Sequence, residues 1–156
     1  MSWKPHRHDL EILSLLQHDA RLSVGDVADR VGMSKSACWR RIQALEEAGV
    51  IRQRVTLLNP EALGLPLSVF IAIRTNQHSD KWANRFKALI ADIPEVLEVY
   101  RMSGDLDYMV RAVVPDMPGY DALYKRMIKI ELFDVSASFV METMKYTTEL
   151  PLREVL

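Results

Sequence analysis

The chain contains 156 residues, of which 49% are hydrophobic and 8% aromatic, with 20 Lys and Arg, 21 Asp and Glu, and one cysteine. This length allows one ordinary domain or two small ones, and the composition excludes intrinsic disorder, collagen-like repeats and a disulfide scaffold. No apolar run approaches the roughly 18 to 20 residues that span a bilayer, and no signal-peptide core precedes the first charges, so we expect a soluble, cytoplasmic protein with no membrane partner.

The start of the chain predicts two short helices. We expect Asp9 to cap the first helix. Its apolar residues recur at helical spacing: Leu10, Ile12, Leu13 and Leu16. Ser23 is expected to cap a second, brief helix, which Gly32 can end in a left-handed conformation.

A third helix is expected to begin after Ser34 and to run to Gly49. Two helices joined by a short turn that contains glycine are typical of a helix-turn-helix. Residues 50–57 then alternate loosely between apolar and polar side chains, which predicts a small hairpin, the wing of a winged helix. We therefore expect residues 1–58 to form a winged helix-turn-helix domain.

Residues 59–66 contain two prolines and a glycine, which marks them as a linker. The remainder, residues 67–156, predicts strands and helices in the order β-α-β-β-α-β. Strands are expected near residues 67–75, 96–102, 108–114 and 134–142, with helices beginning after Ser79 and Asp116. This order is the ferredoxin-like arrangement, so the predicted fold class is α+β.

Both helices of such a domain lie on one face of the sheet, so the other face is uncovered. Four apolar side chains are available to that face, depending on strand register: Phe70, Tyr100, Met102 and Val140. A face of this kind calls for a partner, and self-association is the simplest one.

The near-neutral total charge hides an uneven distribution. The first 55 residues carry nine basic and seven acidic side chains, a balance of +2, whereas the rest carries 11 and 14, a balance of −3. Residues 33–55 alone have a balance of +3, so a contact with a polyanion belongs there. The alternative is that this charge belongs only to a solvated helix face.

The third helix has two distinct faces. At about 100° per residue, Ser34, Cys38, Ile42 and Leu45 cluster on one side, which is expected to face the core. The first outer residues of a helix in the major groove reach base edges. The expected readers of double-stranded DNA are therefore Lys35, Ser36, Trp39 and Arg40, with Gln43 farther along.

Other side chains suit the DNA backbone better than the bases. Arg41, Arg52 and Arg54 are expected near phosphates, and the hydroxyl of Ser34 suits a phosphate or a base edge. Arg40 could bind a guanine through two hydrogen bonds, or it could touch only a phosphate or a carboxylate.

The chain lacks the residue patterns that enzyme catalysis requires. The four histidines at positions 6, 8, 18 and 78 and the single cysteine offer no metal-ligand spacing, and no hydrolase or nucleotide-binding motif occurs. Cys38 is expected to be a small buried side chain, not a nucleophile. We expect no catalytic residues, no metal and no cofactor. The loop Gly104–Tyr108 fits recognition of an amino acid, with a carboxylate for its ammonium group, or is only a hairpin turn.

Five segments of the chain carry specific motifs in a fixed order and spacing: residues 9–16, 22–34, 38–51, 103–108 and 140–142. Together, and over nearly the whole chain, they resemble the Lrp/AsnC family of transcriptional regulators. The resemblance implies a DNA-binding domain followed by an effector and assembly domain, with homodimers that often form octamers of four dimers. Residues 138–151 and the Cys38-Trp39 pair look closest to members that control cysteine breakdown.

The resemblance also implies a small effector, typically an amino acid, bound between dimers. The residues that match the effector segments are Tyr100, Met102, Gly104, Asp105, Asp107, Tyr108, Ser136, Ser138 and Val140. Cysteine is the first candidate effector. The alternative function is an amino-acid-binding module that acts without DNA.

Overall fold

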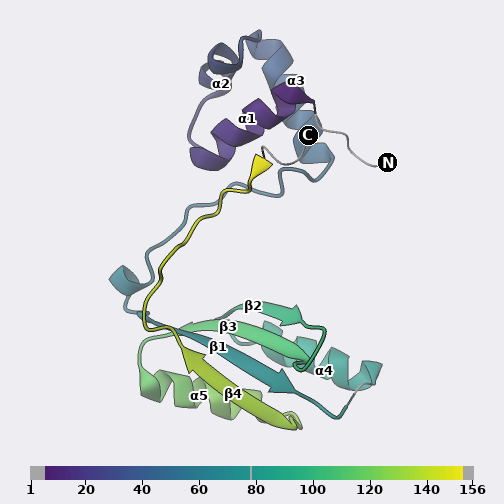
Figure 1. Cartoon of the computed structure of the whole chain (residues 1–156), viewed down its shortest axis with the longest axis vertical. Helices are drawn as coiled ribbons and strands as arrows, with labels where there is room; N and C mark the ends of the chain where they lie inside the picture. The colour runs from purple at the N-terminus through teal and green to yellow at the C-terminus, as the bar shows by residue number, and fades with distance from the viewer. Residues whose placement is uncertain (1–5, 78, 153–156) are drawn as a thin grey trace. The chain divides into compact units, whose positions relative to one another are not determined.

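A computed structural model describes residues 6–77 and 79–152, and the chain forms two compact units (Figure 1). The first unit combines Met1–Leu57 with Lys145–Leu156, and the second is Leu58–Met144. The units divide between Leu57 and Leu58, next to residues 59–66, for which the sequence predicts a linker. The tail from Lys145 onward groups with the first unit, whereas the prediction gave all of 67–156 to the second. Residues 1–5, 78 and 153–156 of the predicted domains lie outside the described residues.

The first unit contains three helices: α1 (Arg7–His18), α2 (Val24–Val31) and α3 (Lys35–Glu47). Side chains from all three helices form one apolar core. Its buried members are Ile12, Leu16, Val27, Ala28, Val31, Cys38, Ile42 and Leu45. The apolar residues that recur at helical spacing in the sequence are therefore the ones that each helix buries in the core.

The ends of α2 and α3 confirm the capping predictions. The hydroxyl oxygens of Ser23 and Ser34 accept hydrogen bonds from the backbone N–H three residues later. Gly32 ends α2 with φ of 68°, a left-handed conformation that favours glycine.

The predicted start of α1 is wrong. The helix begins at Arg7, and Asp9 is its third residue, where its carboxylate accepts the N–H of His6 at 3.2 Å. An acidic residue just before an apolar periodic run is favourable both as the cap and as the third residue of the helix. At either position its carboxylate can accept a backbone N–H at the helix start. The sequence pattern therefore left the exact position open.

The predicted wing hairpin is also wrong, because residues 50–57 carry no strand pairing among the described residues. The N–H groups of Val50 and Ile51 instead both bind the carbonyl of Leu45, which closes α3 beyond Gly49, whose φ is 71°. A tight hairpin turn needs Gly, Asn or Asp in its centre, and none occurs between Val50 and Leu58. Residues 50–57 therefore form no hairpin within the part of the chain that the structure describes.

The second unit is a four-stranded antiparallel sheet with two helices. In chain order it contains the short 3-10 helix η1 (Glu61–Leu63), then β1 (Leu67–Arg74), α4 (Asp80–Ala91), β2 (Val96–Arg101), β3 (Tyr108–Val114), α5 (Met117–Met127) and β4 (Asp134–Phe139). The spatial order of the strands is β2-β3-β1-β4. The predicted β-α-β-β-α-β arrangement is confirmed, with β4 shorter than predicted.

One face of this sheet packs against both helices. Val69, Ile71 and Ile73 of β1 are completely buried, together with Phe86 of α4 and Leu123 of α5. Ser79 caps α4 and Asp116 caps α5, each by accepting a backbone N–H. The alternation along β1 therefore separates a core face from an outer face.

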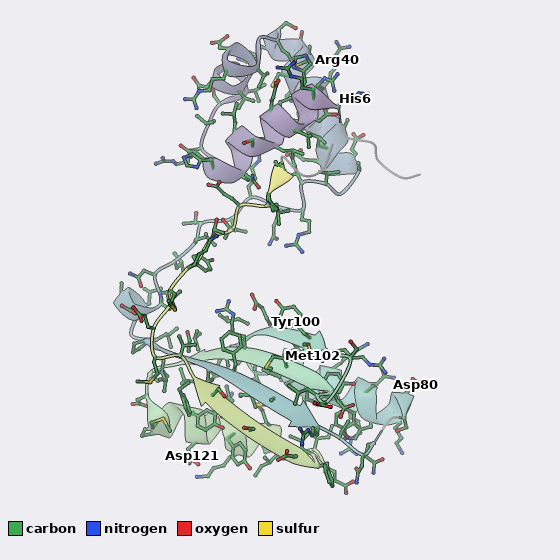
Figure 2. All side chains as sticks on the ribbon, viewed as in Figure 1. His6, Arg40, Asp80, Tyr100, Met102 and Asp121 are labelled. Carbon is green, nitrogen blue, oxygen red and sulfur yellow. The ribbon has the colours of Figure 1, made fainter. Side chains whose placement is uncertain are left out.

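The outer face carries apolar side chains that no described helix covers. Register pairs Phe70 with Arg111 of β3 and Tyr100 with Met109, which places all four on this face. Phe70, Tyr100 and Met102 are 39%, 51% and 44% exposed. Figure 2 labels Tyr100 and Met102 on the sheet. Val140 follows β4 and is half-buried.

Candidate functional site

The free side of α3 carries exposed basic and aromatic residues. Cys38, Ile42 and Leu45 face the core, which turns Lys35, Ser36 and Arg40 to the surface. Trp39 is 52% exposed although it is a large apolar side chain. Among the described residues, no hydrogen bond or ion pair engages the side chains of Lys35 or Arg40, and Figure 2 shows Arg40 at the surface of the first unit. The Ser34 and Ser36 hydroxyl oxygens lie 3.3 Å apart.

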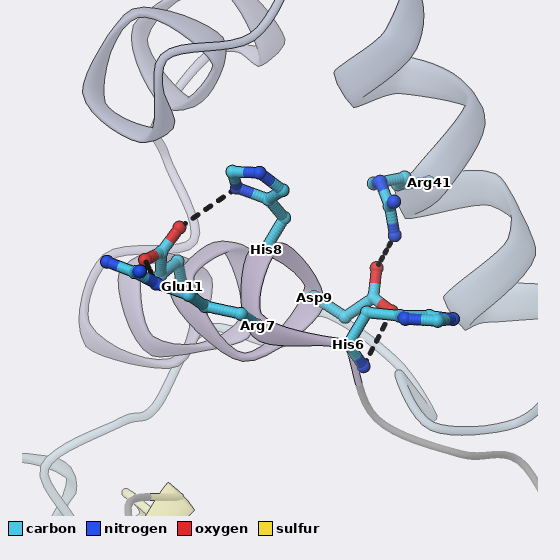
Figure 3. Close-up of polar contacts among 6 residues, drawn as sticks. All are labelled: His6, Arg7, His8, Asp9, Glu11 and Arg41. Atoms are coloured by element: carbon cyan, nitrogen blue, oxygen red, sulfur yellow. Dashed lines mark hydrogen bonds and ion pairs between the residues drawn. The ribbon is translucent and has the colours of Figure 1, made fainter.

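Three of the other predicted DNA-binding residues already have partners within the unit. Arg41 donates from Nη1 to Asp9 Oδ1 at 2.7 Å, as Figure 3 shows. Gln43 donates to one oxygen of Glu46 at 3.0 Å and Arg54 to the other at 3.1 Å. Arg52 is exposed. The predicted set therefore divides into side chains that are available to a ligand and side chains held by carboxylates.

Cys38 is buried, as predicted. Burial raises the pKa of its thiol, because the apolar surroundings disfavour the thiolate. This environment is that of a core residue.

The loop between β2 and β3 is fixed by several hydrogen bonds. The N–H of Met102 binds the carbonyl of Asp107 at 2.9 Å, and the N–H of Asp107 binds the carbonyl of Ile73 at 3.0 Å. Asp107 Oδ2 accepts the buried N–H of Thr75 at 2.8 Å. Gly104 has φ of 108°, a backbone conformation that residues other than glycine rarely adopt. The loop therefore has a defined shape within a single chain.

A small pocket lies beside this loop. Its volume is about 60 Å³. The lining residues are Gln77, Ser79, Asp80, Trp82, Ala83, Arg101, Asp107 and Tyr108. The ring of Tyr108 lies 4.8 Å from that of Phe86, centroid to centroid, so Tyr108 belongs mainly to the core.

The nine predicted effector residues do not form one site in a single chain. Tyr100 lies on β2 and Met102 directly follows that strand, whereas Ser136 and Ser138 lie on β4, at the opposite edge of the sheet. Three interstrand spacings of about 4.8 Å separate those edges by roughly 14 Å, too far for one amino acid to bridge. The loop residues Gly104, Asp105 and Asp107 form a third group.

Several residues near these groups were missed by the sequence prediction. Asp9 binds Arg41 from 32 positions away, and no local pattern signals such a pair. Thr75 and Arg101 lie beside Asp107 because of the register between β1 and β3 and between β2 and β3. Knowledge of that register would have identified both.

An ion pair crosses the outer face of the sheet. Arg111 donates from Nε to Glu98 at 2.9 Å. The guanidinium holds the pKa of the Glu98 carboxyl below its ordinary value of 4.5. This pair places two opposite charges on the same face as the exposed apolar side chain of Phe70.

Two family models match this architecture. Residues 6–52 match the model described as winged helix-turn-helix DNA-binding, and residues 68–150 match the Lrp/AsnC ligand binding domain. The chain belongs to the Lrp/AsnC family. It is accordingly a DNA-binding transcriptional regulator with a ligand-binding domain, and not an enzyme.

Relatives across the whole length agree with this assignment. The glutamate uptake regulatory protein of Zymomonas mobilis is 46% identical over 147 residues, which are 94% of this chain and 90% of that protein. An AsnC family transcriptional regulator from Agrobacterium tumefaciens is 55% identical, with a TM-score of 0.91 over 97% of this chain and all of the other. A regulator from Neisseria meningitidis, solved as a complex with L-Met, is 33% identical with a TM-score of 0.91, covering 98% and 100% of the chains.

Among the residues that the structure describes, no cluster of three or more His, Cys, Asp or Glu side chains could hold a metal ion. None of the described helices combines the length and apolar character needed to cross a membrane.

Proposed function

We propose that α3 reads the DNA sequence through the side chains on its free surface. Lys35, Ser36, Trp39 and Arg40 would contact bases, whereas Ser34 and Arg52 would bind phosphates. The observation that supports this is the exposed position of Arg40 and Trp39 on a helix whose other side is fixed in a core. Arginine suits a guanine, and an apolar ring suits the methyl group of thymine.

Gln43 and Arg54 have a different place in this proposal. Both bind Glu46, so each must exchange a carboxylate for DNA before it can contribute. We assign them to the margin of the interface, where such an exchange costs little because the ion pair is exposed.

We propose that the second domain assembles through the outer face of its sheet into homodimers and further into octamers of four dimers. Phe70, Tyr100 and Met102 support this proposal, because three large exposed side chains on one face are typical of an interface. Dimers would also bring two α3 helices to successive major grooves.

We propose that an amino acid bound between dimers is the effector. Residues on opposite sheet edges can contact one small molecule only if different copies of the chain supply them. Asp105 has a carboxylate that no described residue engages, so it can pair with an ammonium group, while Asp107 shapes the loop by holding Thr75. Ser136 and Ser138 supply hydroxyl groups from the other edge.

Cysteine is the first candidate for that amino acid, because of the likeness of the Cys38-Trp39 pair and of residues 138–151 to regulators of cysteine breakdown. Methionine is the second, since it occupies the Neisseria meningitidis relative. Glutamate is the third, from the name of the Zymomonas mobilis relative.

Thermal unfolding of the full chain in the presence of each of the twenty amino acids tests this proposal. A ligand at 100 times its Kd stabilises the folded state by about 2.7 kcal/mol, which raises Tm by several degrees. Asp105→Asn should abolish that rise, and Asp29→Asn, an equal loss of charge in α2, should not. If no amino acid raises Tm or alters the mobility of DNA from upstream of the protein's own gene, the effector proposal is wrong.

A further inference from the structure

Asp9 is the one buried acidic side chain among the described residues of the first unit. It is only 5% exposed, and both of its oxygens are engaged. Oδ2 accepts the N–H of His6, and Oδ1 accepts Nη1 of Arg41 at 2.7 Å (Figure 3). The carboxylate therefore joins the first turn of α1 to the middle of α3.

Arg41 lies at the border of the buried side of α3. It follows Cys38 by three residues and precedes Leu45 by four, so it shares a helix side with two core residues. Its side chain is 35% exposed. Arg40, its neighbour, lies about 100° farther round the helix on the free surface.

The pair with Asp9 removes one positive charge from the surface near the DNA-contacting helix. Affinity for DNA of any sequence grows with the number of phosphates that Lys and Arg neutralise, because each contact releases condensed counterions. An arginine that is bound to a buried carboxylate does not neutralise a phosphate and so releases no counterions. To do so it would have to leave the carboxylate unpaired, which costs free energy in a buried position.

We propose that Asp9 is a positioning residue for DNA binding, which holds Arg41 against α1 and withholds it from the phosphate backbone. A single DNA-binding domain then binds DNA of random sequence weakly, and occupancy depends on the base contacts and on the joint binding of several linked domains. This inference rests on the proposal that α3 contacts DNA.

The test measures binding of the full chain to a random-sequence duplex at a series of salt concentrations. In Asp9→Asn, the released Arg41 should bind phosphate, so the slope of log K against log salt should steepen by about 0.9 for each DNA-binding domain engaged. In Arg41→Gln the slope should equal that of the unmodified protein. The double variant Asp9→Asn/Arg41→Gln should also return to that slope.

Asp29→Asn is the matched control, because it removes one negative charge from an exposed position without releasing an arginine. A slope in Asp9→Asn no steeper than in Asp29→Asn would overturn the inference. A slope shallower by about 0.9 in Arg41→Gln or in the double variant would also overturn it, because Arg41 would then already bind phosphate.

Circular dichroism checks that each variant is folded. If Asp9→Asn does not fold, the comparison of Arg41→Gln or of the double variant with the unmodified protein still decides the question. Arg40→Ala separates the two proposals. If that substitution leaves DNA affinity unchanged, the proposal that α3 contacts DNA is wrong. If Arg40→Ala lowers DNA affinity but the salt slope of Asp9→Asn equals that of the unmodified protein, only the role of Asp9 is refuted.

Discussion

Replacement of Asp107 by Ala should destabilise the second unit measurably. The carboxylate accepts the N–H of Thr75 at 2.8 Å, and Thr75 is only 7% exposed, so the substitution leaves a buried N–H without an acceptor. A hydrogen bond to a charged group contributes about 1.5 to 3 kcal/mol. With a urea dependence of about 2 kcal/mol per molar, a loss of about 2 kcal/mol lowers the unfolding midpoint by about 1 M.

Urea unfolding of the full chain, followed by circular dichroism, measures this shift. Asp105→Ala is the control, because no described residue engages the Asp105 side chain, whereas Nε of Arg74 binds its backbone carbonyl. Asp107→Asn should lose less than Asp107→Ala, since an amide oxygen can still accept the N–H. Equal midpoints for Asp107→Ala and Asp105→Ala would refute the argument that Asp107 shapes the loop.

Two further predictions concern other parts of the molecule. The side chain of Gln17 makes two hydrogen bonds with the backbone of Leu150, so Gln17→Ala should release the tail and speed tryptic cleavage after Lys145. His18→Ala loses one exposed contact to Glu149 and should change the cleavage rate less. Equal cleavage rates in the unmodified protein and both variants would contradict this role of Gln17. Glu98 has a lowered pKa, so its pair with Arg111 stabilises the fold above pH 4.5, and this contribution is lost as pH falls through the folded pKa. The stability difference between the unmodified protein and Glu98→Gln should therefore shrink on acidification, and a difference that grows would refute the assignment.

The sequence predicted most of the fold because each element carries a local signal. Ser23, Gly32 and Ser34 have the side chains that helix ends require, and the alternation in β1 separates the two faces of the sheet. The prediction of a wing hairpin was wrong because loose alternation of apolar and polar residues is a weak signal when no turn residue accompanies it. Local signals also could not reveal that the tail from Lys145 returns to the first unit.

The candidate site was predictable only where position on one element decides exposure. The outer residues of α3 follow from its buried stripe, so Lys35, Trp39 and Arg40 could be identified from the sequence. The pair between Arg41 and Asp9 could not be, because it depends on how two helices pack. For the same reason, the separation of the effector residues between two sheet edges became visible only with the strand order.

Sequence recognition by α3 rests on the proposed contact between Arg40 and a base. The most direct measurement compares the affinity of the full chain and of Arg40→Ala for two duplexes, one from the upstream region of the protein's own gene and one of random sequence. We expect Arg40→Ala to lose about 1 to 3 kcal/mol of binding free energy on the first duplex and much less on the second. An equal loss on both duplexes would contradict the claim, because Arg40 would then contact only phosphate.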